Sequence, residues 1–223
     1  MILILFGPPG AGKGTQGSRI VSTCGVPKIS TGEIFRDLAA SKTELGLKAK
    51  SYWSTGNLVP DDIVVGLVRE RIAEPDCAGG FILDGFPRTV SQAETFACML
   101  GSSGSRLDGV IEFEVKTEEL VRRLSGRRTC DNCGATFHVV TMPAKVDGIC
   151  DYCGSDLILR NDDNPESIRT RLREYSSKTE PVINYYAQQG LLHKVDADRL
   201  PDVVYNEVHE LLNNMNCSET KAG

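Results

Sequence analysis

The feature that most constrains this chain is a glycine-rich segment between an apolar run and a helical pattern. Residues 1–6 are apolar, residues 7–15 read Gly-Pro-Pro-Gly-Ala-Gly-Lys-Gly-Thr, and a helix is predicted over residues 13–24. Glycines let successive backbone N–H groups point into one concavity, and the helix N-terminus adds the positive end of its dipole. With Lys13 beside them, these groups are typical of a loop that cradles nucleotide phosphates. A tight turn joining a strand to a helix would not need four glycines and a lysine.

The loop departs from the generic phosphate-binding motif at one position. The motif has Ser or Thr directly after the lysine, whereas this chain has Gly14 there and a hydroxyl one residue later, at Thr15. Either Thr15 reaches the metal or the phosphates, or Mg²⁺ is held mostly by water.

Strand-like runs alternate with helical patterns along the chain. The predicted strands occupy residues 1–6, 26–29, 80–84, 109–115 and 193–195. The predicted helices occupy residues 13–24, 31–41, 44–54, 61–72, 89–100, 117–125 and 201–213, and a long helix opens at Asn164 and Pro165. This alternation predicts an α/β fold in which helices flank a parallel five-stranded sheet. Ligands bind beyond the carboxyl ends of such strands, where residues 7–13 and 85–88 lie.

Composition narrows the class of protein. The 223 residues are 40% hydrophobic and 25% charged, which suits a folded protein with a large core. The net charge of -5 argues against a general nucleic-acid binder, which needs a basic surface. Residues 1–6 are too few for a membrane span or a signal segment. We therefore expect a cytoplasmic protein without a nucleic-acid or membrane partner.

Eight cysteines are many for such a protein. Four are scattered and are expected to be small buried side chains or incidental thiols, namely Cys24, Cys77, Cys98 and Cys217. The other four form two Cys-x-x-Cys-Gly repeats, at Cys130 with Cys133 and at Cys150 with Cys153, within a lobe of residues 126–159 that shows no sustained period.

Two such repeats bring four thiolates around one tetrahedral ion. A disulfide pair is disfavoured in a cytoplasmic protein, and a redox role does not explain two matched repeats. Zinc is the default metal, although iron or cobalt would fit. Four protein ligands close the site, so we predict a structural metal that replaces the core which so small a lobe cannot build.

Several segments, taken in order, resemble the adenylate kinase family. They are residues 7–16, residues 30–33 with Arg36, residues 83–88 with Gln92, residues 126–128 and residues 160–163. The resemblance extends to about residue 212. It implies a monomer that transfers the terminal phosphoryl group of Mg²⁺-bound ATP to AMP, reversibly, giving two ADP.

The resemblance also implies which residues bind AMP. Thr31 and Gln92 would hydrogen-bond the adenine, Gly85 would allow close approach to it, and Arg36 and Arg88 would hold the phosphate, because the guanidinium fork binds phosphate bidentately. The further implied contacts are Asn57, Leu58, Val59, Phe86, Pro87, Arg160 and Arg171. Thr89 and Gln92 also fit a capping box, in which Gln92 would only stabilise the start of a helix.

For ATP, the resemblance implies contacts from the phosphate loop, at Gly10, Ala11, Gly12, Lys13, Gly14 and Thr15. Asp84 would orient the waters around Mg²⁺, and Arg199 would offer its carbonyl to the base. Arg123 would clamp the phosphates or stack on the base, which Thr136 and Phe137 would cover. The implied catalytic groups are Lys13, Asp84, Arg88, Arg123, Arg127, Arg160 and Arg171, which neutralise charge in the transition state.

Phosphoryl transfer must exclude water, so parts of the molecule must close over the nucleotides. We predict a core of residues 1–29, 60–121 and 161–223, an AMP-binding insert of residues 30–59, and a lid of residues 122–160 that carries the cysteines. Asp162 and Asp163 form a solvated turn or tie the lid to the core.

Alternative functions predict different residues in the lid and at the base-reading and charged positions. A kinase for UMP or CMP generally has a short lid and a different residue at the base-reading position of Thr31. A zinc-ribbon module that binds nucleic acid needs a charge density that the segment between the cysteine pairs lacks, since Lys145 is its one basic residue. An inactive scaffold would not need every expected charged position filled.

Overall fold

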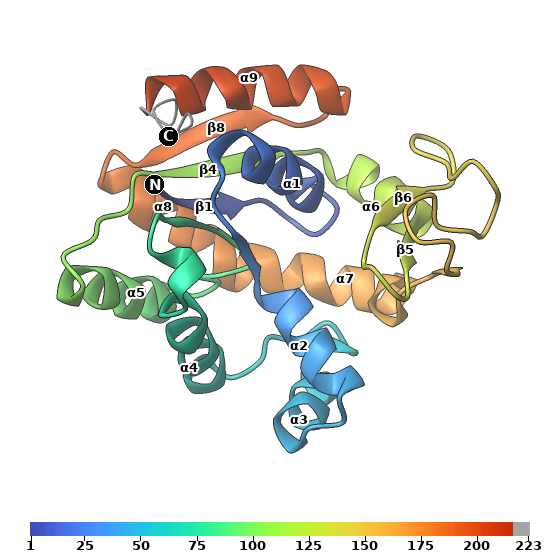
Figure 1. Ribbon diagram of the computed structural model, residues 1–223, viewed down its shortest axis with the longest axis horizontal. Helices are drawn as coiled ribbons and strands as arrows, with labels where there is room; N and C mark the ends of the chain where they lie inside the picture. Colours follow the sequence, from blue (N-terminus) through green and yellow to red (C-terminus); the bar gives the residue numbers. More distant parts are fainter. Residues whose placement is uncertain (216–223) are drawn as a thin grey trace.

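The centre of the fold is a five-stranded parallel sheet in the order β2-β3-β1-β4-β8, as the α/β prediction requires (Figure 1). The protein is represented by a computed structural model, in which residues 1–215 are described. The strands are β1 (Ile2–Phe6), β2 (Lys28–Ser30), β3 (Phe81–Asp84), β4 (Gly109–Glu114) and β8 (Leu192–Asp196). β1 lies between β3 and β4 and is buried throughout, as expected of an apolar strand covered on both faces.

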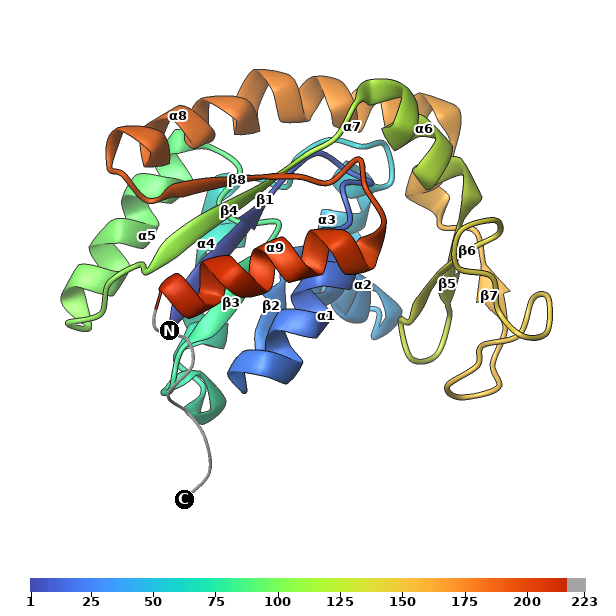
Figure 2. The ribbon, with the colours of Figure 1, turned by 90° about the horizontal axis from the view of Figure 1, so that it is seen from above.

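Helices cover both faces of the sheet (Figure 2). The side chains of Leu3, Leu5 and Ile111 pack with those of α1 and α9, and the side chains of Ile4 and Leu83 pack with those of α4, α5 and α8. The bounds of these helices are α1 (Lys13–Cys24), α4 (Asp61–Ile72), α5 (Val90–Ser102), α8 (Glu180–Gln188) and α9 (Pro201–Asn214). The two layers leave the carboxyl ends of the strands open toward two protruding lobes.

The first lobe is the helical insert, which follows β2 directly. It contains α2 (Thr31–Ala40) and α3 (Glu44–Trp53), and the hydroxyls of Ser30 and Thr43 cap them. The two helices cross so closely that a Cβ at Gly46 would lie 2.2 Å from the backbone of Leu38. Glycine is thus required where they touch.

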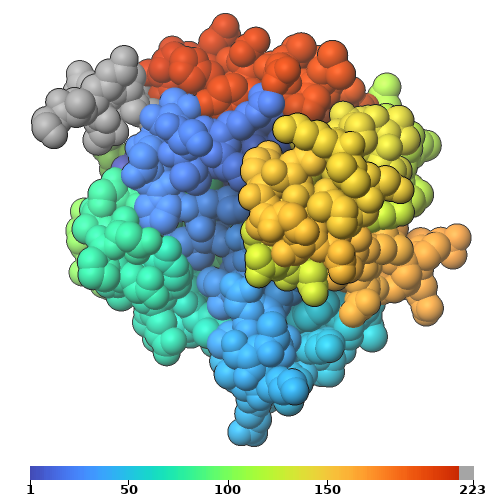
Figure 3. Space-filling model, turned by 45° about the vertical axis from the view of Figure 1, so that its right-hand side comes forward, coloured from blue at the N-terminus to red at the C-terminus, as the bar shows by residue number. Residues whose placement is uncertain are grey.

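The second lobe follows α6 (Thr117–Gly126) and lies above the insert in the view of Figure 3. It holds an antiparallel sheet in the order β6-β5-β7. The strands are β5 (Arg127–Cys130), β6 (Thr136–His138) and β7 (Leu157–Ile158). The buried residues at its centre are Cys130, Phe137 and Cys150. This core is too small to hold a lobe of that length without a cross-link or a metal.

The predicted long helix is interrupted. Its first part is α7 (Pro165–Glu174), a π-helical turn η3 (Tyr175–Thr179) follows, and α8 completes it. Pro181 lies in the first turn of α8 and has no N–H to continue an α-helical ladder, which accounts for the widened turn before it. Two short 3₁₀ turns, η1 (Pro75–Cys77) and η2 (Asn161–Asp163), complete the elements of the described residues.

The scattered cysteines differ from one another. Cys24 is a small buried side chain, as expected, although it is disulfide-bonded and so not a thiol. Cys77 is a buried thiol, Cys98 an exposed one, and Cys217 lies outside the described residues. Among residues 1–215, no helix has both the length and the apolarity that crossing a membrane demands.

Candidate active site

The phosphate loop joins β1 to α1, at the carboxyl end of the central strand. Gly7, Gly10 and Gly12 have φ angles of 145°, 87° and 93°, which side chains rarely adopt. A Cβ at Gly7 would also lie 2.8 Å from the carbonyl oxygen of Phe113 on β4. The glycines therefore fix the curvature of the loop, and α1 begins immediately at Lys13.

The ammonium of Lys13 curls back over this loop. Its Nζ donates to the carbonyl oxygens of Gly7, at 2.6 Å, and Pro8, at 3.0 Å. Burial lowers the pKa of Lys13 to about 8; the charge of Asp84 opposes this, and those of Arg88, Arg171 and Arg127 reinforce it. Lys13 thus shares one electrostatic environment with residues from β3, the lid and α7.

Asp84 ends β3, where it is paired in register with Leu5 of β1 and Ser30 of β2. This places its carboxylate beside both the phosphate loop and the start of the insert. Within residues 1–215 the carboxylate of Asp84 accepts no hydrogen bond. Carboxylate and hydroxyl oxygens suit Mg²⁺, so Asp84 and Thr15 fit the role of orienting a hydrated magnesium ion.

The turn after β3 holds three predicted AMP contacts together. Thr31 donates from Oγ1 to the carbonyl oxygen of Gly85 at 3.0 Å, and Arg88 donates from Nε to the same oxygen at 2.7 Å. A Cβ at Gly85 would lie 2.9 Å from the Arg88 guanidinium. The peptide bond between Phe86 and Pro87 is cis. Burial lowers the pKa of Arg88, with the charge of Asp84 acting in the opposite sense.

The other residues predicted to contact the base of AMP lie in the segment after α3 and at the start of α5. Asn57 is exposed and donates to Thr55 Oγ1 at 2.9 Å, Leu58 is half-buried and Val59 is buried. Gln92 is 2% exposed, and both ends of its amide are bonded within the protein.

Arginines from the lid and α7 gather around two buried carboxylates. Arg127 forms a bidentate pair with Asp163, at 2.7 and 2.5 Å, and Arg160 forms one with Asp162, at 2.9 and 2.6 Å. Arg171 contacts both carboxylates at 3.1 Å. The side chain of Asp163 is fully buried. Of the two readings of this acidic pair, a solvated turn is excluded, because both side chains bridge the arginines of the lid and the core.

The electrostatics of this cluster favour an anion. Burial raises the pKa of Asp162, but the charges of Arg171 and Arg160 outweigh it and leave that pKa below its ordinary value. Burial, with the charge of Arg160 acting in the same direction, lowers the pKa of Arg171 to about 10 and that of Arg36 to about 10. Cations that depress one another's pKa bind a polyanion such as a nucleotide phosphate strongly.

The predicted ATP-base residues divide into two groups. Arg123 lies at the junction of α6 and β8, where it donates to Glu119, at 2.7 Å, and to the carbonyl of Ala197, at 2.8 Å. Arg199 follows Ala197 by two positions, and its side chain is paired with Glu207. Thr136 and Phe137 lie instead on β6 in the lid. Phe137 is 5% exposed and packs in the core of the lid against Tyr152.

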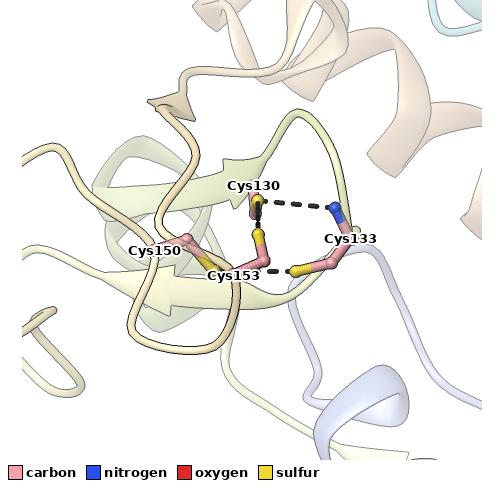
Figure 4. A group of neighbouring side chains, drawn as sticks. All are labelled: Cys130, Cys133, Cys150 and Cys153. Atoms are coloured by element: carbon pink, nitrogen blue, oxygen red, sulfur yellow. Dashed lines mark hydrogen bonds between the residues drawn. The ribbon is translucent and has the colours of Figure 1, made fainter.

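The four lid cysteines converge as the sequence predicts (Figure 4). Their Sγ atoms all lie within 4.8 Å of one another, with 3.4 Å between Cys130 and Cys153 and 3.6 Å between Cys133 and Cys150. Four sulfurs at 2.3 Å from a zinc ion would be about 3.8 Å apart, so the thiols already approximate a tetrahedral site. Gly134 and Gly154 close the two turns with φ near 71° and 74°.

Sequence reasoning missed two supporting carboxylates. Glu119 holds Arg123 and Arg122, and Asp61 holds Gln92 and Thr89. The one sequence signal for each is its place in the first turn of a helix, which many acidic residues share for the helix dipole alone.

Comparison with known proteins agrees with this geometry. A family model described as adenylate kinase matches residues 5–191. Curated proteins named adenylate kinase are 50% identical in Syntrophobacter fumaroxidans, 49% in Archaeoglobus fulgidus and 50% in Carboxydothermus hydrogenoformans, each over 212 residues. These alignments cover 95% of this chain and 100%, 98% and 99% of the relatives. The chain therefore belongs to the adenylate kinase family of enzymes.

Proposed function

We propose that this enzyme transfers the terminal phosphoryl group of ATP to AMP, reversibly, to give two ADP. One observation carries the proposal: the charges that act on Lys13 of the phosphate loop come from Asp84 and from the arginines of three other segments. The residues proposed to hold the phosphates of ATP and those proposed to hold the phosphate of AMP would then surround one point, as transfer between two nucleotides requires.

In this mechanism an oxygen of the AMP phosphate attacks the γ-phosphorus of ATP, and the bond from that phosphorus to the β–γ bridging oxygen breaks. Lys13, Arg123 and Arg127 would hold the ATP phosphates, Arg36 and Arg88 would hold AMP, and Arg160 and Arg171 would neutralise the transferred group. Thr31 and Gln92 would read the adenine of AMP. Bound Mg²⁺ would neutralise phosphate charge, and Asp84 and Thr15 are the residues that would hold its waters.

The proposal includes closure of the lid, residues 122–160, and of the insert, residues 30–59, over the nucleotides. Both lobes border the cluster of arginines, and water must leave for transfer to outpace hydrolysis. It also includes a structural zinc ion held by Cys130, Cys133, Cys150 and Cys153, with iron or cobalt as alternatives. We also place the enzyme in the cytoplasm, as a monomer.

A panel of acceptors tests the substrate. The rate of ADP formation from ATP is measured with AMP, UMP, CMP and GMP, and with Lys13→Ala as a control enzyme. We expect AMP to be phosphorylated fastest and the control to be inactive. Faster turnover of a pyrimidine nucleotide would instead support a UMP or CMP kinase.

A further inference from the structure

Asp61 opens α4, just beyond the insert, and lies against a residue proposed to read the base. Its Oδ1 accepts a hydrogen bond from Gln92 Nε2 at 2.6 Å, and its Oδ2 accepts one from Thr89 Oγ1 at 2.7 Å. Thr89 also accepts from the backbone N–H of Gln92 at 3.2 Å, capping α5. The carboxylate of Asp61 is therefore held in place by the start of the helix that carries Gln92.

The other end of the Gln92 amide is held as well. Its Oε1 accepts from the backbone N–H of Arg88 at 2.7 Å, and the side chain is 2% exposed. A carboxylate only accepts hydrogen bonds and a backbone N–H only donates them. Turning the amide over would set Oε1 against the carboxylate of Asp61 and Nε2 against the N–H of Arg88. Both ends thus dictate a single orientation before any nucleotide binds.

That orientation matters because an amide can pair with either kind of purine. Adenine offers an amino donor at C6 and an acceptor at N1, whereas a 6-oxopurine offers an acceptor at C6 and a donor at N1. The amide keeps one N–H and one acceptor position for a ligand after its bonds to Asp61 and Arg88 are made. An amide that could turn over would pair with both edges, and a fixed amide pairs well with one.

We propose that Asp61 is a positioning residue that fixes the Gln92 amide and so sets the preference for adenine over 6-oxopurines. This inference rests on the proposed AMP site. Asp61 touches no substrate and acts through Gln92. A site that is rigidly complementary to one hydrogen-bonding edge rejects the opposite edge, because mismatched buried groups are left unpaired.

The test compares AMP with inosine monophosphate, which differs from AMP at C6 and N1 alone. The kcat and KM values for both acceptors, and the KM for ATP, are measured in the full-length enzyme, in Asp61→Ala, and in Asp62→Ala. Asp62 is the matched control, since it is an exposed acid in the same first turn of α4. We expect Asp61→Ala to raise the KM for AMP about tenfold and to lower the ratio of kcat/KM for AMP over inosine monophosphate by a similar factor. The KM for ATP and the control variant should be unchanged.

A conservative variant separates positioning from stability. In Asp61→Asn, Oδ1 can still accept from Gln92 while Nδ2 donates to Thr89, so selectivity should return toward that of the unaltered enzyme. Asp61→Ser keeps a polar residue at the helix start and replaces Asp61→Ala if that variant fails to fold. Unchanged AMP kinetics and selectivity in a folded Asp61→Ala, whatever its melting temperature, or loss of selectivity in Asp61→Asn, would overturn the inference.

Gln92→Ala distinguishes this inference from the proposal on which it rests. If Gln92→Ala leaves the KM for AMP unchanged, Gln92 serves only the start of α5, and both the assigned AMP site and the role of Asp61 are wrong. If Gln92→Ala raises that KM while Asp61→Ala does not, the AMP site stands and only the positioning role is wrong.

Discussion

The ammonium of Lys13 bonds to its own loop in this structure, through the carbonyls of Gly7 and Pro8. Nucleotide phosphates offer it stronger, charge-assisted acceptors. We expect Lys13→Ala to lower kcat/KM for ATP at least 100-fold while leaving the melting temperature within a few degrees of the original. Steady-state kinetics and thermal unfolding check this together, and a variant that keeps full activity would contradict the role of the loop.

The same residue predicts a pH dependence. Burial lowers the pKa of Lys13 to about 8, so the free enzyme loses the protonated, phosphate-binding form as the pH rises through that value. The kcat/KM for ATP should therefore fall above pH 8. Bound phosphates favour the charged form, so the decline in kcat should lie at higher pH, because kcat reports the nucleotide complex. If kcat and kcat/KM for ATP declined at the same pH, the bound phosphates would not be stabilising the charged form of Lys13, and this role of Lys13 would be wrong.

At the scale of elements, η2 joins the lid to the core through buried ion pairs. The pKa of Asp162 lies below its ordinary value of 3.8, so this carboxylate stabilises the fold above that value and loses its contribution as the pH falls below it. We expect Asp162→Asn to lower the free energy of unfolding at pH 7 by about 3 kcal/mol, because it leaves Arg160 without its buried partner and leaves Arg171 with Asp163 alone.

The difference in free energy of unfolding between the unaltered protein and Asp162→Asn should shrink as the pH falls below 3.8, because the unaltered protein loses the same charge there. Denaturant unfolding across this pH range measures it, with the exposed Asp156→Asn as the control. A deficit that stays constant with pH would mean that the ion pairs do not account for it.

The lid is the element whose stability depends on the cysteines. Its buried core contains only three residues, Cys130, Phe137 and Cys150. We expect one metal ion per chain and its loss in Cys153→Ser, with a lower melting temperature for the lid and an intact phosphate-loop core. Metal analysis and calorimetry check this, with the exposed Cys98→Ser as the control. Unchanged melting and activity after verified metal loss would contradict a structural role.

Local signals explain which elements could be predicted from the sequence. The capping hydroxyls of Ser30 and Thr43 and the glycines of the loop act on their immediate neighbours, so the predicted helices over residues 31–41 and 44–54 agree with α2 and α3 to within one residue, and the one over residues 13–24 matches α1. β5, β6 and β7 were not predicted, because they are two to four residues long and lie in the lobe of residues 126–159, which shows no sustained period and no buried apolar run such as that of β3. The π-helical turn η3 was not predicted either, because it depends on the single proline that follows it, Pro181.

At the scale of the whole molecule, the site is assembled by long-range contacts. Thr31 meets Gly85, Arg123 meets Ala197, and Arg127 of the lid meets Asp163 of the core. The motifs and the family resemblance predicted which segments take part. They could not predict the contact of Asp61 with Gln92, 31 positions apart, since neither residue signals it locally.

The central claim is that these contacts build one centre for transfer between two nucleotides. Phosphorus-31 NMR of an ATP and AMP mixture tests it directly, by following every phosphorus-containing product over time. We expect two ADP for each ATP and AMP consumed, no inorganic phosphate, and no reaction with Lys13→Ala. Release of inorganic phosphate without loss of AMP would show an ATPase and would contradict the claim.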